Sequence, residues 1–179
     1  IEQTPPNAAN FIFSLRKLGY SFSSALADII DNSIGHGEAN KIFINYYPQE
    51  SWLSIQDNGI GMDKKDLLNA MTLGSSSPES IRGENDLGRF GCGLKTASFS
   101  QCTRLTVISN QKNTVSAACW NLERIKQSGN WDLEILNKNE IRDLTTKYDL
   151  SIDKSGTIIL WEDIDSLRGR DDQEIEDDQ

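Results

Sequence analysis

The chain has 179 residues, which predicts a single domain that is large enough to bury a hydrophobic core. Its formal net charge is −9, with acidic residues concentrated after Glu162, so the sequence shows no basic surface of the kind that binds nucleic acid. No apolar run approaches the roughly 20 residues that cross a membrane, and the N-terminus has no signal-peptide pattern. Three cysteines without metal-ligand spacing indicate reduced thiols in a cytoplasmic protein.

Two helices are expected near the N-terminus. Apolar residues recur at every third or fourth position of residues 7–18, and Gly19 is expected to close this first helix. The second helix is expected over residues 22–34, with Ser21 as its N-cap. Its apolar face contains five residues, namely Phe22, Leu26, Ile29, Ile30 and Ser33.

The opposite face of this second helix is polar and allows two interpretations. Asp28 and Asn32 lie one turn apart, with Gly35 on the same face and Asp31 beside them. The first interpretation is an ordinary solvated surface. The second is that both side chains point at one ligand, since the amide oxygen of Asn32 suits Mg²⁺ and the Asp28 carboxylate could deprotonate a water molecule.

Residues 57–62, with the sequence Asp-Asn-Gly-Ile-Gly-Met, organise the centre of the chain. Residues 51–57 alternate as a half-buried strand, which we expect to form a hairpin with a strand at 41–47 ended by Pro48. The carboxylate of Asp57 therefore follows a strand and precedes Gly59 and Gly61, whose bare backbone permits a flat ligand to approach. This combination suits the edge of adenine, although the motif alone also fits a simple turn into a helix at 64–71 capped by Asp63.

A second glycine-rich segment follows this helix. Residues 74–86 are polar and rich in glycine and serine, which predicts a mobile loop or lid. The lid is followed by Gly88, Gly91, Gly93 and Lys95, just before a helical pattern, an arrangement that favours phosphate binding. It is not a P-loop, because Leu94 separates the last glycine from the lysine. A glycine-rich loop that only closes under a helix is the alternative.

The remainder indicates a sheet. We expect a hairpin of residues 105–109 and 114–120, a strand at 131–135, a short helix at 139–148, and a strand at 156–161 that opens with Gly156 and Thr157. The last strand could equally be an ordinary buried strand. These elements assign residues 1–162 to one domain, with the lid at about 74–91, and leave residues 163–179 as an acidic tail or the start of a linker to a downstream domain.

Together these four motifs, in this order, resemble the GHKL ATPases, which include gyrase, heat-shock chaperone ATPases, histidine kinases and MutL. The resemblance covers roughly residues 22–161 and is closest to the MORC-like and MutL-like members. It implies the Bergerat fold, an α/β (α+β) two-layer sandwich in which helices pack on one face of a mixed, mostly antiparallel sheet. It also implies ATP or ADP and Mg²⁺ as cofactors.

The resemblance assigns roles by motif position. Asp57 would bind the adenine amino group, assisted by Gly61 and Thr157, within a pocket that also includes Gly59 and Met62. Asn32 would hold Mg²⁺, and Asp28 would occupy the position that activates water. The phosphates would be surrounded by five residues, namely Gly88, Gly91, Gly93, Leu94 and Lys95.

Two positions depart from the family pattern. The water-activating residue is usually Glu, and Asp28 is one methylene shorter, so hydrolysis is expected to be slow. Gly35 stands where an acidic residue is usual. Three functions remain open: an ATP hydrolase that acts as a nucleotide-dependent switch and dimerisation module, a nucleotide-binding switch with negligible hydrolysis, and a histidine-kinase-type catalytic domain. Expected partners are an adenine nucleotide, a downstream domain of the same protein and, with ATP, a second copy. Neither a membrane nor nucleic acid is expected as a partner.

Overall fold

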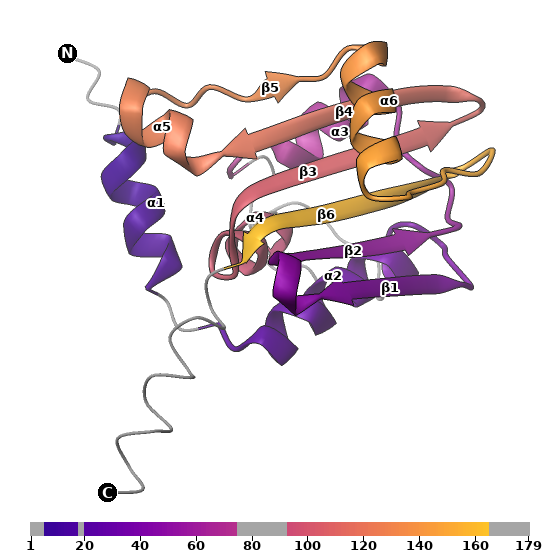
Figure 1. The fold of residues 1–179 in the computed structure, drawn as a ribbon, viewed down its shortest axis with the longest axis horizontal. Coiled ribbons are helices and arrows are strands. Elements are labelled where there is room, and N and C mark those ends of the chain that lie inside the picture. Colours follow the sequence, from indigo (N-terminus) through magenta and orange to yellow (C-terminus); the bar gives the residue numbers. More distant parts are fainter. Residues whose placement is uncertain (1–5, 18–19, 75–92, 165–179) are drawn as a thin grey trace, which may run out of the picture.

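A six-stranded antiparallel sheet forms the centre of the protein (Figure 1). The computed structural model describes residues 6–17, 20–74 and 93–164. Along the sheet the strand order is β1-β2-β6-β3-β4-β5, and every pairing between these strands is antiparallel. The strands are β1 (Ile42–Tyr47), β2 (Trp52–Asp57), β3 (Cys102–Gln111), β4 (Thr114–Asn121), β5 (Glu134–Ile135) and β6 (Gly156–Ile164).

Helices cover both faces of this sheet to different extents. The helices are α1 (Ala8–Arg16), α2 (Phe22–Gly35), α3 (Lys64–Met71), α4 (Gly93–Phe99), α5 (Leu122–Ser128) and α6 (Lys138–Lys147), with a 3₁₀ turn at Pro48–Glu50 between β1 and β2. Residues from α1 to α5 share one large core with the sheet. Figure 1 shows α2, α3 and α4 behind the sheet and α6 in front of it.

The main core follows the alternation of side chains along the central strands. Leu53 and Ile55 of β2, Ile159 and Trp161 of β6, and Leu105 and Val107 of β3 point to the helical layer and are buried. Residues of paired strands that face each other lie on the same side of the sheet, and Leu53, Trp161 and Leu105 form such a row. The α/β two-layer sandwich expected from the sequence is confirmed.

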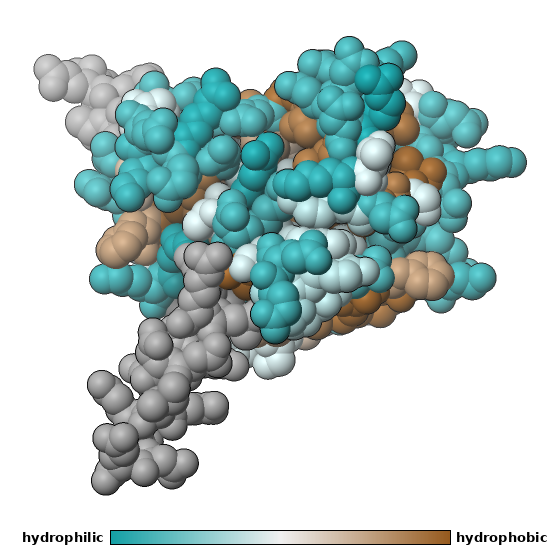
Figure 2. All heavy atoms as spheres, viewed as in Figure 1, coloured by the Kyte–Doolittle hydropathy of each residue, from teal (hydrophilic) through white to brown (hydrophobic). Residues whose placement is uncertain are grey.

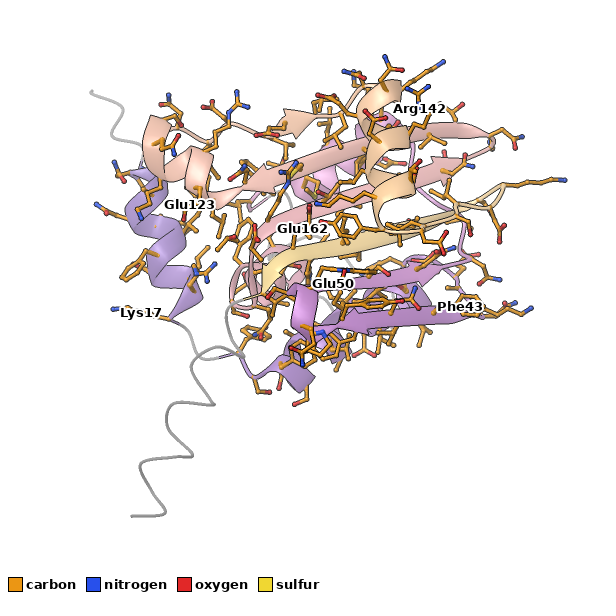
Figure 3. The ribbon with its side chains drawn as sticks, in the orientation of Figure 1. Lys17, Phe43, Glu50, Glu123, Arg142 and Glu162 are labelled. Atoms are coloured by element: carbon orange, nitrogen blue, oxygen red, sulfur yellow. The ribbon has the colours of Figure 1, made fainter. Side chains whose placement is uncertain are left out.

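A smaller second core lies under α6 on the other face. Trp52, Ile108, Ala117, Ile158 and Leu160 are buried there, and Ile141, Leu144 and Tyr148 pack onto them. Figure 3 shows Glu162 on this face and Arg142 on the outer side of α6, and Figure 2 shows that the outer side of α6 is hydrophilic. The expected layer of helices on one face is therefore present, and α6 adds a cover to part of the opposite face.

The observed boundaries of helices and strands differ from the expected ones mainly where the local sequence pattern is weak. The strand expected at 131–135 is only Glu134–Ile135 long, and α5, a seven-residue helix capped by Asn121, was not predicted. Strand β6 continues to Ile164, past the strand end expected at residue 161. Residues 18–19, lid residues 75–91 and the acidic segment from residue 165 lie outside the described residues. Within the described part of the chain, no helix is long and apolar enough to span a bilayer.

Candidate functional site

The site is centred on the Asp57 carboxylate, at the last residue of β2 and directly opposite Thr157 of β6. This side chain is only 9% exposed. Its Oδ1 accepts hydrogen bonds from Gly59 N at 2.9 Å and Thr157 N at 3.1 Å, and its Oδ2 accepts one from Ser33 Oγ at 3.0 Å. These donors compensate for the lost hydration of a buried charge. Because Oδ2 receives a single donor from the described residues, it has capacity for a further donor from a ligand.

Ser33 is a site residue that the sequence did not reveal. It lies on the buried face of α2 with Ala25 and Ile29, where it was expected, but its hydroxyl is paired with Asp57 rather than packed among apolar side chains. The available signal was a polar residue on an apolar helix face, immediately after Asn32. The bond fixes α2 against the end of β2.

The loop after Asp57 is anchored on both sides. The Asn58 Oδ1 accepts hydrogen bonds from Asn40 N at 3.1 Å and Lys41 N at 2.9 Å, which holds the loop against the start of β1. At its other end, Met62 N donates to Ser109 Oγ at 2.8 Å. The Ser109 Oγ also lies 2.8 Å from Thr157 Oγ1, so Ser109 connects the end of the Asp57 loop at Met62 to the start of β6 at Thr157. Ser109 was likewise not predicted.

Two glycines of the loop are required by their surroundings. A Cβ on Gly59 would overlap the carbonyl oxygen of Gly37, which accepts a hydrogen bond from Ile60 N at 2.8 Å. Gly61 has φ of +70°, and a Cβ there would overlap the carbonyl oxygen of Asn110. The loop is therefore packed tightly against the segment that follows α2 on one side and against β3 on the other, a close approach that only glycine permits.

Asp28 and Asn32 lie on one face of α2, and both are half-buried, whereas Asp31 is exposed. The Asn32 carboxamide makes no hydrogen bond to another described residue, so its oxygen is available to a ligand. Burial raises the pKa of the Tyr20 phenol, and the negative charge of the Asp28 carboxylate raises it further. Gly35 is exposed at the end of the helix.

Helix α4 begins at Gly93, where the sequence predicted the end of the glycine-rich segment. Gly93 and Leu94 are half-buried, while Lys95 is only 2% exposed. The Lys95 ammonium donates to the carbonyl oxygens of Ala70 at 2.8 Å and Thr72 at 2.9 Å, at the end of α3. A role for Lys95 at a phosphate stays a prediction, and Gly88 and Gly91 lie outside the described residues.

The comparison with known families gives the decisive match. Residues 20–157 match the family described as "Histidine kinase-, DNA gyrase B-, and HSP90-like ATPase". The chain belongs to this GHKL ATPase family. The matched range contains the Asp28 helix, the Asp57 loop and the start of β6, so the family assignment rests on the same residues as the site.

Several GHKL ATPases among curated proteins are similar to parts of the chain. The ATPase morc-1 of Caenorhabditis elegans is 29% identical over 96 residues, covering 52% of this chain and 11% of that protein. The chaperone HtpG of Campylobacter jejuni is 30% identical over 118 residues, covering 60% and 19%. The mismatch repair protein MutL of Trichormus variabilis is 31% identical over 104 residues, covering 58% and 18%. The matches thus span about a tenth to a fifth of these relatives.

The described residues contain few groups that could hold a metal ion. No group of three or more His, Cys, Asp or Glu side chains that could bind an ion occurs in the described ranges. The Asn32 amide oxygen is a hard donor, and its side chain makes no hydrogen bond to another described residue, so it would suit Mg²⁺. Asn32 therefore remains the proposed protein ligand.

Proposed function

We propose that this GHKL domain binds Mg²⁺ and ATP, hydrolyses ATP slowly, and acts as a nucleotide-dependent switch in a larger protein. The observation that carries the proposal is the Asp57 carboxylate. It is buried and oriented by Ser33, Gly59 and Thr157, and its Oδ2 accepts a single hydrogen bond from the part of the chain that the structure describes, which leaves capacity for a donor from a ligand. This acceptor suits the exocyclic amino group of adenine. Guanine has a carbonyl at that position, so GTP should bind poorly.

The polar face of α2 supports the chemical step. Asn32 would contribute an oxygen ligand to Mg²⁺, which neutralises phosphate charge when bound. Asp28, one turn earlier, would accept a proton from water while the water oxygen bonds to the terminal phosphorus and the bond to ADP breaks. The shorter reach of Asp28 compared with Glu supports a low rate.

A nucleotide-binding switch with negligible hydrolysis is the second candidate. The same shortened carboxylate favours it, because a base that cannot approach the attacking water leaves binding intact and removes turnover. The Asp57 pocket serves both candidates equally well. A single-turnover measurement with Mg²⁺ and ATP separates them, since only the hydrolase forms ADP from enzyme-bound ATP.

The proposed switch operates within a larger assembly. The relatives are about five to nine times as long as the matched segments, which supports further domains acting together with this one. We therefore propose that a downstream domain and ATP-dependent pairing of two copies complete the catalytic site. Light scattering of the full-length protein with and without a non-hydrolysable ATP analogue tests this part of the proposal.

Calorimetry with Mg²⁺ and ADP tests the binding proposal directly. Asp57→Ala removes the acceptor and leaves Ser33 Oγ and two backbone N–H groups unpaired, so the affinity for ADP should fall about tenfold or more. Asp132→Ala, at an exposed position, is the matched control and should bind like the parent. Equal ADP affinity for Asp57→Ala and the parent, or equal affinity of the parent for GDP and ADP, would overturn the assignment.

A further inference from the structure

A row of polar side chains crosses three neighbouring strands beside the proposed adenine site. Asp57 of β2 lies directly opposite Thr157 of β6, and Thr157 lies directly opposite Ser109 of β3. Figure 1 shows these three strands side by side in the sheet. Residues opposite each other on paired strands project from the same face, so the three side chains share the face that carries the main core. All three are buried, and Ser109 is fully buried.

The Ser109 hydroxyl contacts three groups. It accepts a hydrogen bond from Met62 N at 2.8 Å, and it lies 3.2 Å from the carbonyl oxygen of Gly156 and 2.8 Å from Thr157 Oγ1. The bond to Met62 has one possible direction, because a backbone N–H only donates. Ser109 itself has a single hydroxyl proton, which it can donate either to Gly156 O or to Thr157 Oγ1. The choice between these two acceptors determines what Thr157 presents to a ligand.

Each arrangement gives the Thr157 hydroxyl a different character. If Ser109 donates to Gly156 O, Thr157 donates its own proton to Ser109 and presents only lone pairs to a ligand. If Ser109 donates to Thr157 Oγ1, the Thr157 proton is available to a ligand. Adenine carries a hydrogen-bond acceptor, N1, next to its amino group, whereas guanine carries a donor, N1–H, at the same place. The second arrangement is therefore the complement of adenine, beside the Asp57 carboxylate that would receive the amino group.

We propose that Ser109 is a positioning residue for recognition of the base: it donates to Thr157 Oγ1, so that the Thr157 hydroxyl donates to N1 of the bound adenine. This inference rests on the proposed binding of adenine nucleotides at Asp57. Its physical basis is that a site built to hydrogen-bond a ligand atom discriminates against an analogue that lacks this atom. Asp57 alone recognises the amino group, and the two hydroxyl groups extend recognition to the adjacent ring nitrogen. Ser109 acts through Thr157 and does not touch the nucleotide.

A purely structural role for Ser109 makes a different prediction. Its bond to Met62 N also holds the end of the Asp57 loop, so Ser109→Ala should weaken nucleotide binding in either case. A structural role lowers the affinity for every nucleotide by the same factor. A positioning role also removes the preference for a nucleotide that carries N1. The ratio of two affinities therefore separates the roles, and a loss of affinity alone does not.

The experiment compares ADP with 1-deaza-ADP, in which a C–H group replaces N1 and the amino group is retained. In calorimetry with Mg²⁺ the parent should prefer ADP about tenfold, and Ser109→Ala should reduce this preference to about twofold or less. Ser116→Ala is the matched control, because Ser116 lies opposite Ser109 on β4, is half-buried and makes no side-chain hydrogen bond to another described residue. This control should keep the parental preference.

Two further variants keep the result decisive. Thr157→Val removes the hydroxyl but keeps the backbone N–H that donates to Asp57, so it should abolish the preference, and adding Ser109→Ala should change the ratio no further. Ser109→Cys, whose thiol is a weak donor of similar shape, should also lower the ratio and serves if Ser109→Ala does not fold. A preference that survives in a folded Ser109 variant overturns the inference, as does a parent without a preference.

The same measurements separate this inference from the proposed function. ADP binding that depends on Asp57 but shows a ratio insensitive to Ser109→Ala overturns the positioning role and leaves the adenine site intact. A parent that does not bind ADP overturns both.

Discussion

Ser33 Oγ lies 3.0 Å from Asp57 Oδ2, and this hydrogen bond joins α2 to the end of β2. Asp28 and Asn32 lie on the same helix, so the proposed catalytic groups and the proposed base-binding carboxylate belong to one connected unit. The bond is buried, and the loss of a partner in such a bond is costly because the remaining charge cannot be hydrated.

Ser33→Ala should therefore weaken both nucleotide binding and stability. The variant deprives the Asp57 carboxylate of one of its donors, and we expect the free energy of unfolding to fall by about 1–2 kcal/mol. The ADP affinity should fall several-fold, because Asp57 is then held less firmly. Urea denaturation and calorimetry measure the two effects. Ser23→Ala, exposed in the first turn of the same helix, is the control; equal behaviour of the two variants would show that the buried bond is unimportant.

Gly61 and Gly129 form a natural pair for testing how tightly the Asp57 loop is packed. Their φ angles are +70° and +71°, but a Cβ on Gly61 would overlap the Asn110 carbonyl, whereas the space around Gly129 is open. Gly129→Ala should cost about 1 kcal/mol of stability from backbone strain alone. Gly61→Ala should cost clearly more and also reduce ADP affinity. Equal losses in thermal denaturation would mean that the loop moves away from β3 freely.

Variants of α2 separate nucleotide binding from hydrolysis. Asp28→Asn keeps the shape of the side chain but removes the basic oxygen, so ADP binding should persist while single-turnover hydrolysis is lost. Asp28→Glu should preserve or raise the rate if reach is limiting. Asn32→Ala should instead weaken binding of the nucleotide in the presence of Mg²⁺. Parental hydrolysis by Asp28→Asn would exclude Asp28 as the base and make the exposed Asp31 the next candidate.

Lys95→Met tests whether the lysine supports the fold, the phosphates or both. In the structure its ammonium donates to Ala70 O and Thr72 O, so removing it leaves buried carbonyl groups at the end of α3 without these donors. We expect a loss of about 2 kcal/mol or more in urea denaturation without nucleotide. Lys65→Met, exposed on α3, should have little effect. Unchanged stability with lost ADP binding would assign the ammonium to phosphate alone.

The pH dependence of stability should show how much the hydrogen bond between Tyr148 and Glu162, which attaches the end of α6 to the sheet, contributes to stability. Tyr148 Oη donates to Glu162 Oε1 at 2.7 Å, and burial followed by the Glu162 bond and charge raises the pKa of Tyr148 well above 10. A raised pKa in the folded state stabilises the protein below the unfolded value of about 10, and this contribution is lost as pH increases beyond it.

Tyr148→Phe should accordingly lower the free energy of unfolding at pH 8 by about 1–2 kcal/mol. The difference in stability between the variant and the parent should become smaller as pH rises above 10. Urea midpoints of the variant and the parent, measured between pH 8 and 11, provide the comparison. A constant difference across this range would show that the phenol of Tyr148 does not titrate with unfolding.

The sequence predicted those features that depend on local order along the chain. Asp57, with its strand before it and its glycines after it, lies where the motif placed it, because strand alternation and turn chemistry are local. Ser33 and Ser109 were missed because their partners are 24 and 47 residues away in sequence. A serine carries no local signal of such a partner.

The second core under α6 was missed for a different reason. Apolar spacing in residues 138–147 shows that a helix has a buried face, but it does not state which side of the sheet receives that face. Lys95 presents the same limit, since a lysine in a glycine-rich motif predicts an anion and not the carbonyl groups of Ala70 and Thr72. In both cases the missing information is the contact partner.

Asp28, Asn32 and Ser33 all lie on one uninterrupted helix, so the geometry of α2 fixes the spacing between these three residues. A helix rises about 1.5 Å per residue, which sets Asp28 and Ser33 about 7.5 Å apart along its axis. A single inserted or deleted residue between them would rotate one group by about 100° relative to the other. Length variation in proteins built on this plan should therefore accumulate in connections such as residues 36–41, and not within α2.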